Sequence, residues 1–240
     1  MLPLYFGGMG MYYGWATTSS IIIMVVSLII TIIAQINVKT TFAKYSKIKS
    51  HRGMTGRDAA EQILRYNGCS YVRLESIQGN LTDHYDPRSE VIRLSSSTEN
   101  IDSIAAIGVA AHEAGHAVQY KEGYFPIKMR SALIPICNIG SQFSWIAVIL
   151  GVAFSWPVLA YVGVLLFAFA VIFQLITLPV EFNASSRAIK ALDESNILTN
   201  EEIKGAKKVL TAAALTYVAA LATSILQLIR LLLIARRSNN

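Results

Sequence analysis

Charged side chains are scarce in this sequence and are missing altogether from two long stretches. Only 15% of the 240 residues are Asp, Glu, Lys or Arg, whereas 53% are hydrophobic. Residues 1–37 and 132–180 contain no Asp, Glu, Lys, Arg or His. An ordinary soluble domain carries about 25% charged residues. The composition therefore excludes an ordinary soluble domain and predicts a mainly α-helical membrane protein.

Cysteine and histidine are also few. The two cysteines, Cys69 and Cys137, do not form a Cys-x-x-Cys pair, which excludes a disulfide framework and a thiolate zinc site. Of the four histidines, His51 lies among basic residues and is expected to be solvated. The net charge is +6, but the basic residues cluster beside apolar segments, so we expect contact with the lipid bilayer and no nucleic-acid partner.

The uncharged stretches predict about four transmembrane helices. Residues 20–36 are long enough to cross about 30 Å of hydrocarbon, and without a basic region before them they read as a retained anchor. Residues 132–180 suffice for a helical hairpin that turns at Ser155-Trp156-Pro157. Residues 210–234 form the fourth candidate, interrupted by Arg230, and whether they fully cross stays open.

The distribution of Lys and Arg predicts the orientation. Basic residues follow the first span and flank the hairpin, whereas none precede the first span. By the positive-inside rule, the segment between the spans faces the cytoplasm in a multi-pass membrane protein. The predicted segments are an N-terminal anchor at 1–37, a catalytic insert at 38–131, the hairpin at 132–180, a cytoplasmic helix at 181–209, and a C-terminal transmembrane helix with its tail at 210–240.

The insert is expected to be small and α+β. Thr55 and Asp58 form a capping box before a helix that stops at Asn67-Gly68. Short strands are predicted around residues 72–75 and 91–94. A strand edge there would either present an extended substrate peptide or be merely structural.

Residues 111–116 read Ala-His-Glu-Ala-Gly-His, inside a helix predicted from Asn100 or Ser103 to near Gly123. On a helix the two histidines share one face, where they could bind one Zn²⁺ with Glu113 as general base. The alternative is a satisfied pair of buried histidines on an alanine-rich helix. Glycine within a helix costs about 1 kcal/mol relative to alanine, so Gly115, with Gly108, predicts a smooth surface against which another helix lies closely.

A catalytic zinc site needs a third protein ligand. Glu181 is the best candidate, because it is the first charge after the uncharged hairpin; otherwise it is an interfacial acid that ends a span. His84 lies in what reads as a loop between Asp83 and Asp86. It is either a surface residue or an active-site group, as a competing third ligand or a transition-state donor.

Three segments together resemble the YugP-type bacterial neutral zinc metallopeptidases, over nearly the whole chain. They read AAHEAGHA at 110–117, DHYDPR at 83–88 and PVEFNAS at 179–185. This family is similar to the HtpX-like membrane proteases, in which a glutamate on a later helix completes a His, His, Glu site. The resemblance implies a zincin-like insert, with His112, His116 and Glu181 binding one Zn²⁺ and Glu113 as base. It also implies that the membrane is the bacterial inner (plasma) membrane.

One departure from that pattern concerns the support of a zinc histidine. HtpX-like enzymes usually carry an aspartate four residues after the ligand glutamate, where this chain has Ser185. Support would then come from the Ser185 hydroxyl, from Asn183 or from elsewhere.

These observations predict a membrane-bound zinc endopeptidase that cleaves membrane or membrane-proximal proteins at the cytoplasmic face. Arg187, His84 or a tyrosine is expected to stabilise the oxyanion. The alternative is a non-enzymatic metal-binding scaffold or regulatory subunit with a vestigial zinc site. An intramembrane protease is disfavoured because the apolar run before His112 is too short to cross a bilayer, and a metal transporter because the spans offer no ionisable ligands.

Overall fold

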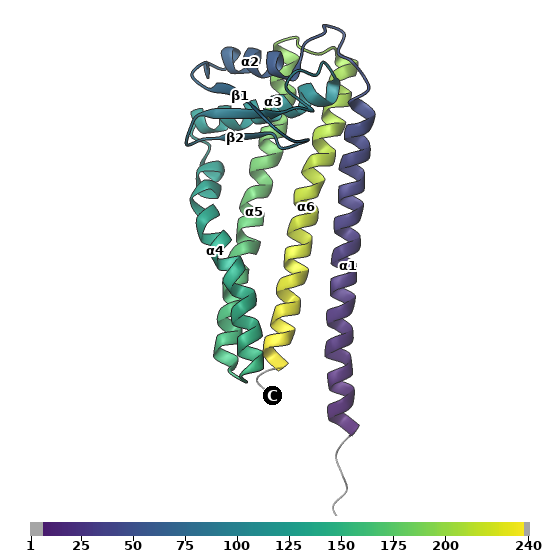
Figure 1. The fold of residues 1–240 in the computed structure, drawn as a ribbon, viewed down its shortest axis with the longest axis vertical. Helices are drawn as coiled ribbons and strands as arrows, with labels where there is room; N and C mark the ends of the chain where they lie inside the picture. The colour runs from purple at the N-terminus through teal and green to yellow at the C-terminus, as the bar shows by residue number, and fades with distance from the viewer. Residues whose placement is uncertain (1–6, 238–240) are drawn as a thin grey trace, which may run out of the picture. The chain divides into compact units, whose positions relative to one another are not determined.

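The computed structural model describes the backbone of residues 7–237 and side chains from Thr18 to Arg236. Residues 1–6 and 238–240, the ends of the predicted first and last segments, lie outside this range. The described chain is mainly helical with one small sheet, as predicted (Figure 1). Its elements are α1 (Gly7–Tyr45), α2 (Gly56–Tyr66), β1 (Arg73–Ile77), β2 (His84–Asp86), β3 (Val91–Ser95), α3 (Ile104–Lys121), α4 (Phe125–Ala153), α5 (Pro157–Glu194) and α6 (Asn200–Arg237).

The chain divides into two compact units. We call the first the helical unit; it comprises residues 1–33, 132–175 and 218–240. The second, the α+β unit, comprises residues 34–131 and 176–217. Helices α1, α4, α5 and α6 each contribute residues to both units.

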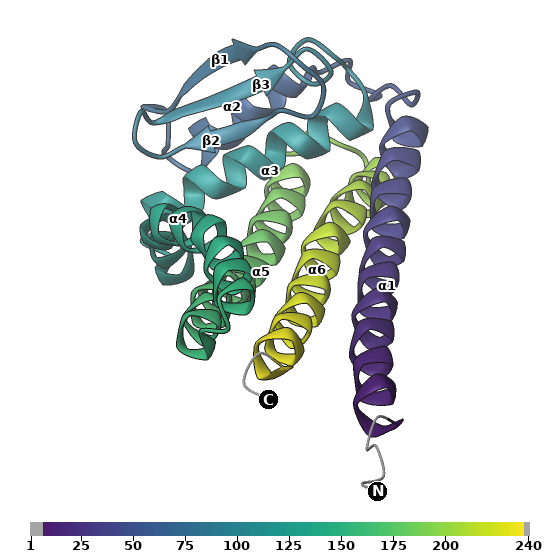
Figure 2. The ribbon, with the colours of Figure 1, turned by 60° about the horizontal axis from the view of Figure 1, so that its bottom comes forward.

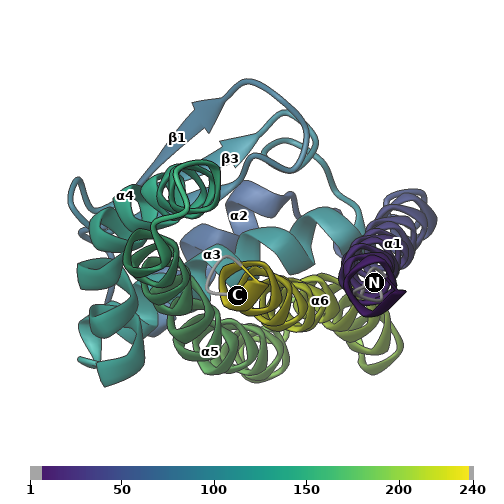
Figure 3. The same ribbon diagram turned by 90° about the horizontal axis from the view of Figure 1, so that it is seen from below.

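Apolar surface dominates the helical unit. The α4–α5 connection lies at the predicted Ser155-Trp156-Pro157 break, with Pro157 as the first residue of α5. Val148 of α4 and Val164 of α5 pack with Leu231 of α6, three helices that Figure 3 shows nearly end-on. Of the most apolar window of α1, only 6% is buried. Helices α1, α4, α5 and α6 are each long and apolar enough to span a membrane, so this is a membrane protein with four candidate transmembrane helices.

All four boundaries expected from composition, after residues 37, 131, 180 and 209, fall inside continuous helices. Helix α5 continues through Pro179 and Glu181 to Glu194, and α6 begins at Asn200 rather than near residue 210. The change from apolar to polar residues that suggested these boundaries does not interrupt the helical backbone. Glu181 therefore lies on the helix that also forms the second half of the predicted helical hairpin.

Helix α2 begins and ends where its capping signals predict. The backbone N–H of Asp58 donates to the Thr55 hydroxyl over 3.2 Å, and that of Thr55 donates to the Asp58 carboxylate over 2.9 Å. These two bonds satisfy donors that the first helical turn leaves free. The apolar face of α2, which includes Ala59 and Ile63, is buried in the core of the α+β unit, where α2 packs against α3.

The sheet has the order β1-β3-β2, with β1 parallel and β2 antiparallel to β3. The central strand β3 is the most buried: Val91, Ile92 and Leu94 are fully enclosed. Helix α3 lies against β3 and the edge strand β2 (Figure 2). The expectation that His84 lies in a loop was wrong, because it pairs with Arg93 as the first residue of β2. The flanking acids suggested a turn, and pairing with a buried strand overrides that local preference.

Helix α3 has the predicted bounds, with Ser103 as its N-cap and Gly123 just beyond its end in a left-handed conformation. The close helix contact expected at Gly115 is confirmed. A Cβ at Gly115 would lie 2.7 Å from the carbonyl oxygen of Ala184 on α5. At Gly108 a Cβ would lie 3.6 Å from the Cβ of Ala206, which is ordinary contact. Gly115 therefore permits the approach of α5 to α3, whereas Gly108 does not limit packing.

We predict that Gly115→Ala destabilises the protein and weakens its zinc binding, although alanine favours a helix by about 1 kcal/mol over glycine. The added methyl must displace the α5 backbone, which carries Glu181. Gly108→Ala is the matched control and should be neutral or stabilising by up to about 1 kcal/mol. Thermal unfolding and zinc titration of both purified variants test this. A Gly115→Ala protein as stable as Gly108→Ala would contradict it.

Candidate metal centre

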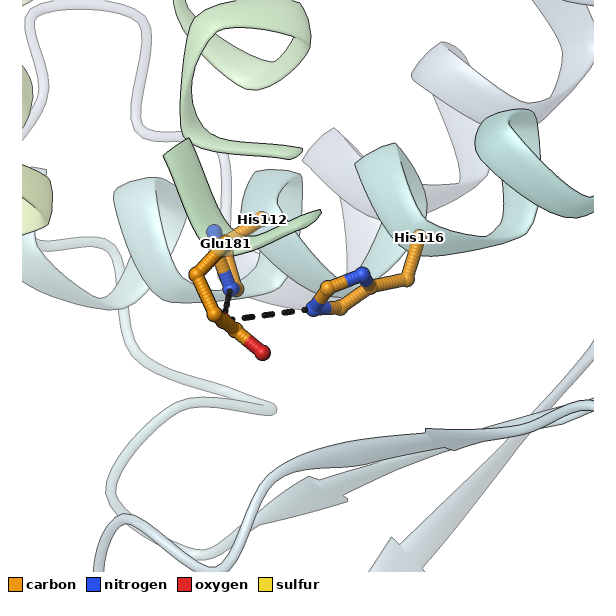
Figure 4. A group of neighbouring side chains, drawn as sticks. All are labelled: His112, His116 and Glu181. Carbon is orange, nitrogen blue, oxygen red and sulfur yellow. Dashed lines mark hydrogen bonds and ion pairs between the residues drawn. The ribbon is translucent and has the colours of Figure 1, made fainter. Parts of the chain in front are cut away.

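Two imidazoles project from the same face of α3. His112 and His116 lie one helical turn apart, and their ring centroids are separated by 4.7 Å with the planes at 79°. His116 is buried and His112 is partly buried. Figure 4 shows both rings turned toward the side chain that enters from α5.

That side chain is Glu181, which is only 1% exposed. Its Oε2 lies 3.2 Å from Nε2 of His112 and 3.6 Å from Nε2 of His116 (Figure 4). The potential ligand atoms of the three residues all lie within 4.8 Å of one another. The structure thus brings together the three residues that the sequence singled out as zinc ligands.

The donor set fits zinc. Tetrahedral Zn²⁺ takes nitrogen and oxygen ligands at about 2.0–2.2 Å, which places neighbouring donor atoms about 3.4 Å apart. The two Glu181 to histidine distances, 3.2 and 3.6 Å, bracket that spacing. A buried carboxylate also needs compensating charge, which a divalent cation supplies. His112, His116 and Glu181 could therefore hold one Zn²⁺ and leave a fourth position for water or substrate.

A chain of hydrogen bonds fixes the tautomer of His116. Arg187, which can only donate, donates from Nε to Oδ1 of Asn183 over 2.7 Å. Gln119 donates from Nε2 to the same Oδ1 and to the carbonyl of Val180, each over 2.9 Å. Its Oε1 must then accept, and it lies 3.0 Å from Nδ1 of His116. His116 therefore carries its proton on Nδ1, so the lone pair of Nε2 faces the site.

His112 has a weaker partner of the same kind. The hydroxyl of Ser185, on α5, lies 3.2 Å from Nδ1 of His112. When the hydroxyl accepts from Nδ1, Nε2 of His112 is also left free to bind metal. The uncharged hydroxyl of Ser185 supports the imidazole more weakly than the negative carboxylate of an aspartate at this position would.

Arg130, near the start of α4, holds the other oxygen of Glu181. Its Nη1 lies 2.8 Å from Oε1, close enough for an ion pair but without hydrogen-bond geometry. Within the described residues, Oε1 of Glu181 and Nε of Arg130 are both buried and make no hydrogen bond. The two carboxylate oxygens thus have separate partners: Oε1 faces the guanidinium, and Oε2 faces the imidazoles.

Glu113 lies beside this cluster and is buried. Its Oε2 accepts a hydrogen bond from the backbone N–H of Tyr85, on β2, over 2.9 Å. Burial raises the pKa of Glu113 to about 7, partly opposed by the nearby His112. In the metal-free protein this carboxyl can therefore gain or lose a proton near neutral pH.

The other two side chains suggested for the site have partners away from the cluster. Arg187 pairs with Glu122 over 2.5 Å besides bonding Asn183. His84 places Nδ1 2.9 Å from the carbonyl of Thr82 and Nε2 3.5 Å from Arg93.

Three groups beside the cluster were not predicted from the sequence: Gln119, Arg130 and the Tyr85 amide. Gln119 could have been found, because it lies three residues after His116 and so on the same face of α3. Arg130 and Tyr85 come from other elements, and nothing local in the sequence places them beside Glu181 or Glu113.

We predict that Gln119→Leu lowers zinc affinity by roughly 10–100-fold, the usual cost of removing the group that orients a metal-binding histidine. Gln119→Glu keeps an acceptor for His116 and should lose less. Gln62→Leu is the matched control, since Gln62 also donates to a backbone carbonyl, that of Ser195, over 3.0 Å, but belongs to α2. Competition with a chromogenic chelator measures all three. Equal losses for Gln62→Leu and Gln119→Leu would show a general packing effect instead.

A family described as "Putative neutral zinc metallopeptidase" matches residues 20–236. A Bacillus subtilis (strain 168) protein named "Putative membrane protease YugP" is 45% identical over 201 residues, which cover 84% of this chain and 89% of the relative. No solved structure matches the chain. The family resemblance carried by the three sequence segments is confirmed: this chain belongs to the neutral zinc metallopeptidases and is a hydrolase of that family.

Proposed function

We propose that this protein is a membrane-bound zinc endopeptidase that cleaves membrane or membrane-proximal proteins at the cytoplasmic face. The observation that carries the proposal is the convergence of His112 and His116 with Glu181, from a different helix, next to the buried carboxylate of Glu113. Two imidazoles and two carboxylates in this arrangement supply the ligands and the base of a zinc hydrolase.

Zinc held by His112, His116 and Glu181 would polarise the scissile carbonyl and lower the pKa of the attacking water. Glu113 takes the proton from that water and returns it to the leaving amine. The N–H of Tyr85 fixes one oxygen of Glu113. Arg130 brings a guanidinium into contact with the cluster, so we propose it or a tyrosine as the oxyanion donor, in place of Arg187 and His84, whose partners lie away from the cluster.

The edge strand β2 is the proposed substrate platform of a zincin-like insert. It is paired with β3 on one side, and the N–H of Tyr85 on its other side points to Glu113. An extended peptide alongside β2 would lie next to the base. This favours an unfolded or looped segment as the substrate over a folded helix.

Cleavage at the membrane surface is favoured over cleavage within the bilayer. Helix α3, which carries both histidines and Glu113, is not among the four helices apolar and long enough to span, within residues 18–236. The basic residues between the spans support the cytoplasmic side for this segment. Anionic lipid and a membrane-associated protein substrate are the partners we propose.

The principal test compares the wild type with Glu113→Gln on a membrane-anchored reporter, using purified protein with zinc. We expect proteolysis to fall at least about 100-fold, the low end for loss of a general base, with zinc content unchanged. Glu99→Gln is the matched control: Glu99 is as buried as Glu113, at 8% exposure each, but pairs with Arg57. If the wild type binds zinc and cleaves no reporter, the non-enzymatic scaffold is favoured. A Glu113→Gln enzyme of full activity would exclude Glu113 as the base.

The orientation is tested by cysteine labelling in a bacterial host, after Cys69 and Cys137 are replaced by alanine. Tyr66 and Trp156 are similarly exposed, at 59% and 57%, and lie on α2 and in the α4–α5 turn. We expect a membrane-impermeant maleimide to label Trp156→Cys in intact cells, and Tyr66→Cys only after permeabilisation. The reverse pattern would place the metal centre outside the cytoplasm.

A further inference from the structure

A groove of about 630 Å³ runs between α1 and α6 within the α+β unit. The C-terminal end of α1 and the N-terminal part of α6, which line it, lie side by side in Figures 1 and 2. Asn37 and Tyr45 lie on the α1 wall, and Lys204 and Leu215 on the α6 wall. None of the residues that line this groove belongs to the metal centre.

The groove is strongly cationic. Four lysines line it, one from α1 and three from α6, and no acidic side chain does so: Lys44, Lys204, Lys207 and Lys208. The ammonium of Lys44 lies 5.6 Å from the ring centre of Tyr45, and that of Lys204 pairs with Glu201 over 2.7 Å. Lys207 and Lys208 are exposed and have no ion pair or hydrogen bond with any described residue.

The lysines that α6 contributes to the groove repel one another. Lys204 lies three residues before Lys207 and four before Lys208, so the three ammonium groups share a helix face. Like charges at these spacings destabilise a helix. A bound anion would convert this repulsion into attraction, which makes the groove a candidate anion site.

The helices also become apolar at the groove. Lys208 is the last charged residue of α6 before Arg230, and Lys39 is the first of the chain, two residues after Asn37. Ala212 and Leu215 continue the lining on the apolar side. A phospholipid has this same sequence of chemistry, with a phosphate next to acyl chains, whereas a soluble anion has no use for the apolar part.

We propose that this groove binds the headgroup of an anionic phospholipid, with the phosphate among Lys44, Lys207 and Lys208. An acyl chain would lie along Leu215. A lysine near the membrane surface attracts anionic lipid, and a groove that gathers four lysines selects lipid by charge as well as by shape. Both helices that form the groove, α1 and α6, are candidate membrane spans.

The test is native mass spectrometry of the full chain in detergent with phosphatidylglycerol, and with phosphatidylcholine of the same acyl chains as the zwitterionic reference. The wild type should bind phosphatidylglycerol at least about tenfold more tightly than phosphatidylcholine. Lys207→Gln/Lys208→Gln should lose about tenfold in affinity for it, and Lys207→Arg/Lys208→Arg should keep it. These side chains are exposed, and unchanged thermal unfolding without lipid confirms that the variants fold.

Lys39→Gln/Lys47→Gln is the matched control, because it removes the same charge from exposed lysines near the apolar boundary that do not line the groove. It should bind phosphatidylglycerol as the wild type does, and an equal loss would reduce the effect to general surface attraction. Inorganic phosphate should not displace the lipid. If it does so fully, the groove is a site for soluble anions and the proposal fails. The readout is binding, so its outcome is independent of whether the protein cleaves peptides.

Discussion

The structure depends on the burial of one carboxylate. Glu181 is 1% exposed, and a charge so enclosed is tolerated only when other groups compensate it. Its partners come from two other helices: the imidazoles of His112 and His116 from α3, and the guanidinium of Arg130 from α4. This compensation requires α5 to lie against α3, which Gly115 permits by having no side chain. Helix packing and the composition of the metal centre are therefore one constraint.

The hydrogen bonds of Gln119 join the same two helices and prepare the site at the same time. Through its amide, Gln119 binds the Val180 carbonyl and the Asn183 side chain of α5, and its oxygen accepts from His116. The bonds that hold α5 in place thus also fix which imidazole nitrogen is free for metal. Arg187 stabilises the far end of this network rather than reaching the cluster itself. A change that loosens α5 would consequently alter both the distance of Glu181 and the tautomer of His116.

Features set by local signals could be predicted from the sequence, and features set by tertiary pairing could not. The capping box of α2 and the Pro157 break each depend on residues within a few positions and were predicted, and Ser103 was one of the two predicted N-cap candidates for α3. Glu181 was found because it is the first charge after a long uncharged stretch, supported by family resemblance. His84 was misassigned, because its strand is specified by β3, a partner that its own neighbours do not reveal. The contacts of Arg130 depend on the fold in the same way.

The two carboxylates at the centre differ in surroundings, and that difference suits different roles. Glu181 lies between imidazoles and a guanidinium, which favour its charged form and so its use as a ligand. Glu113 has one backbone N–H as its hydrogen-bond partner in a buried setting, and its pKa is raised to about 7. A ligand must hold its charge, whereas a base must both accept and release a proton near neutral pH. The fold therefore surrounds the proposed ligand and the proposed base with different numbers of cationic and donor groups, although both residues carry the same side chain.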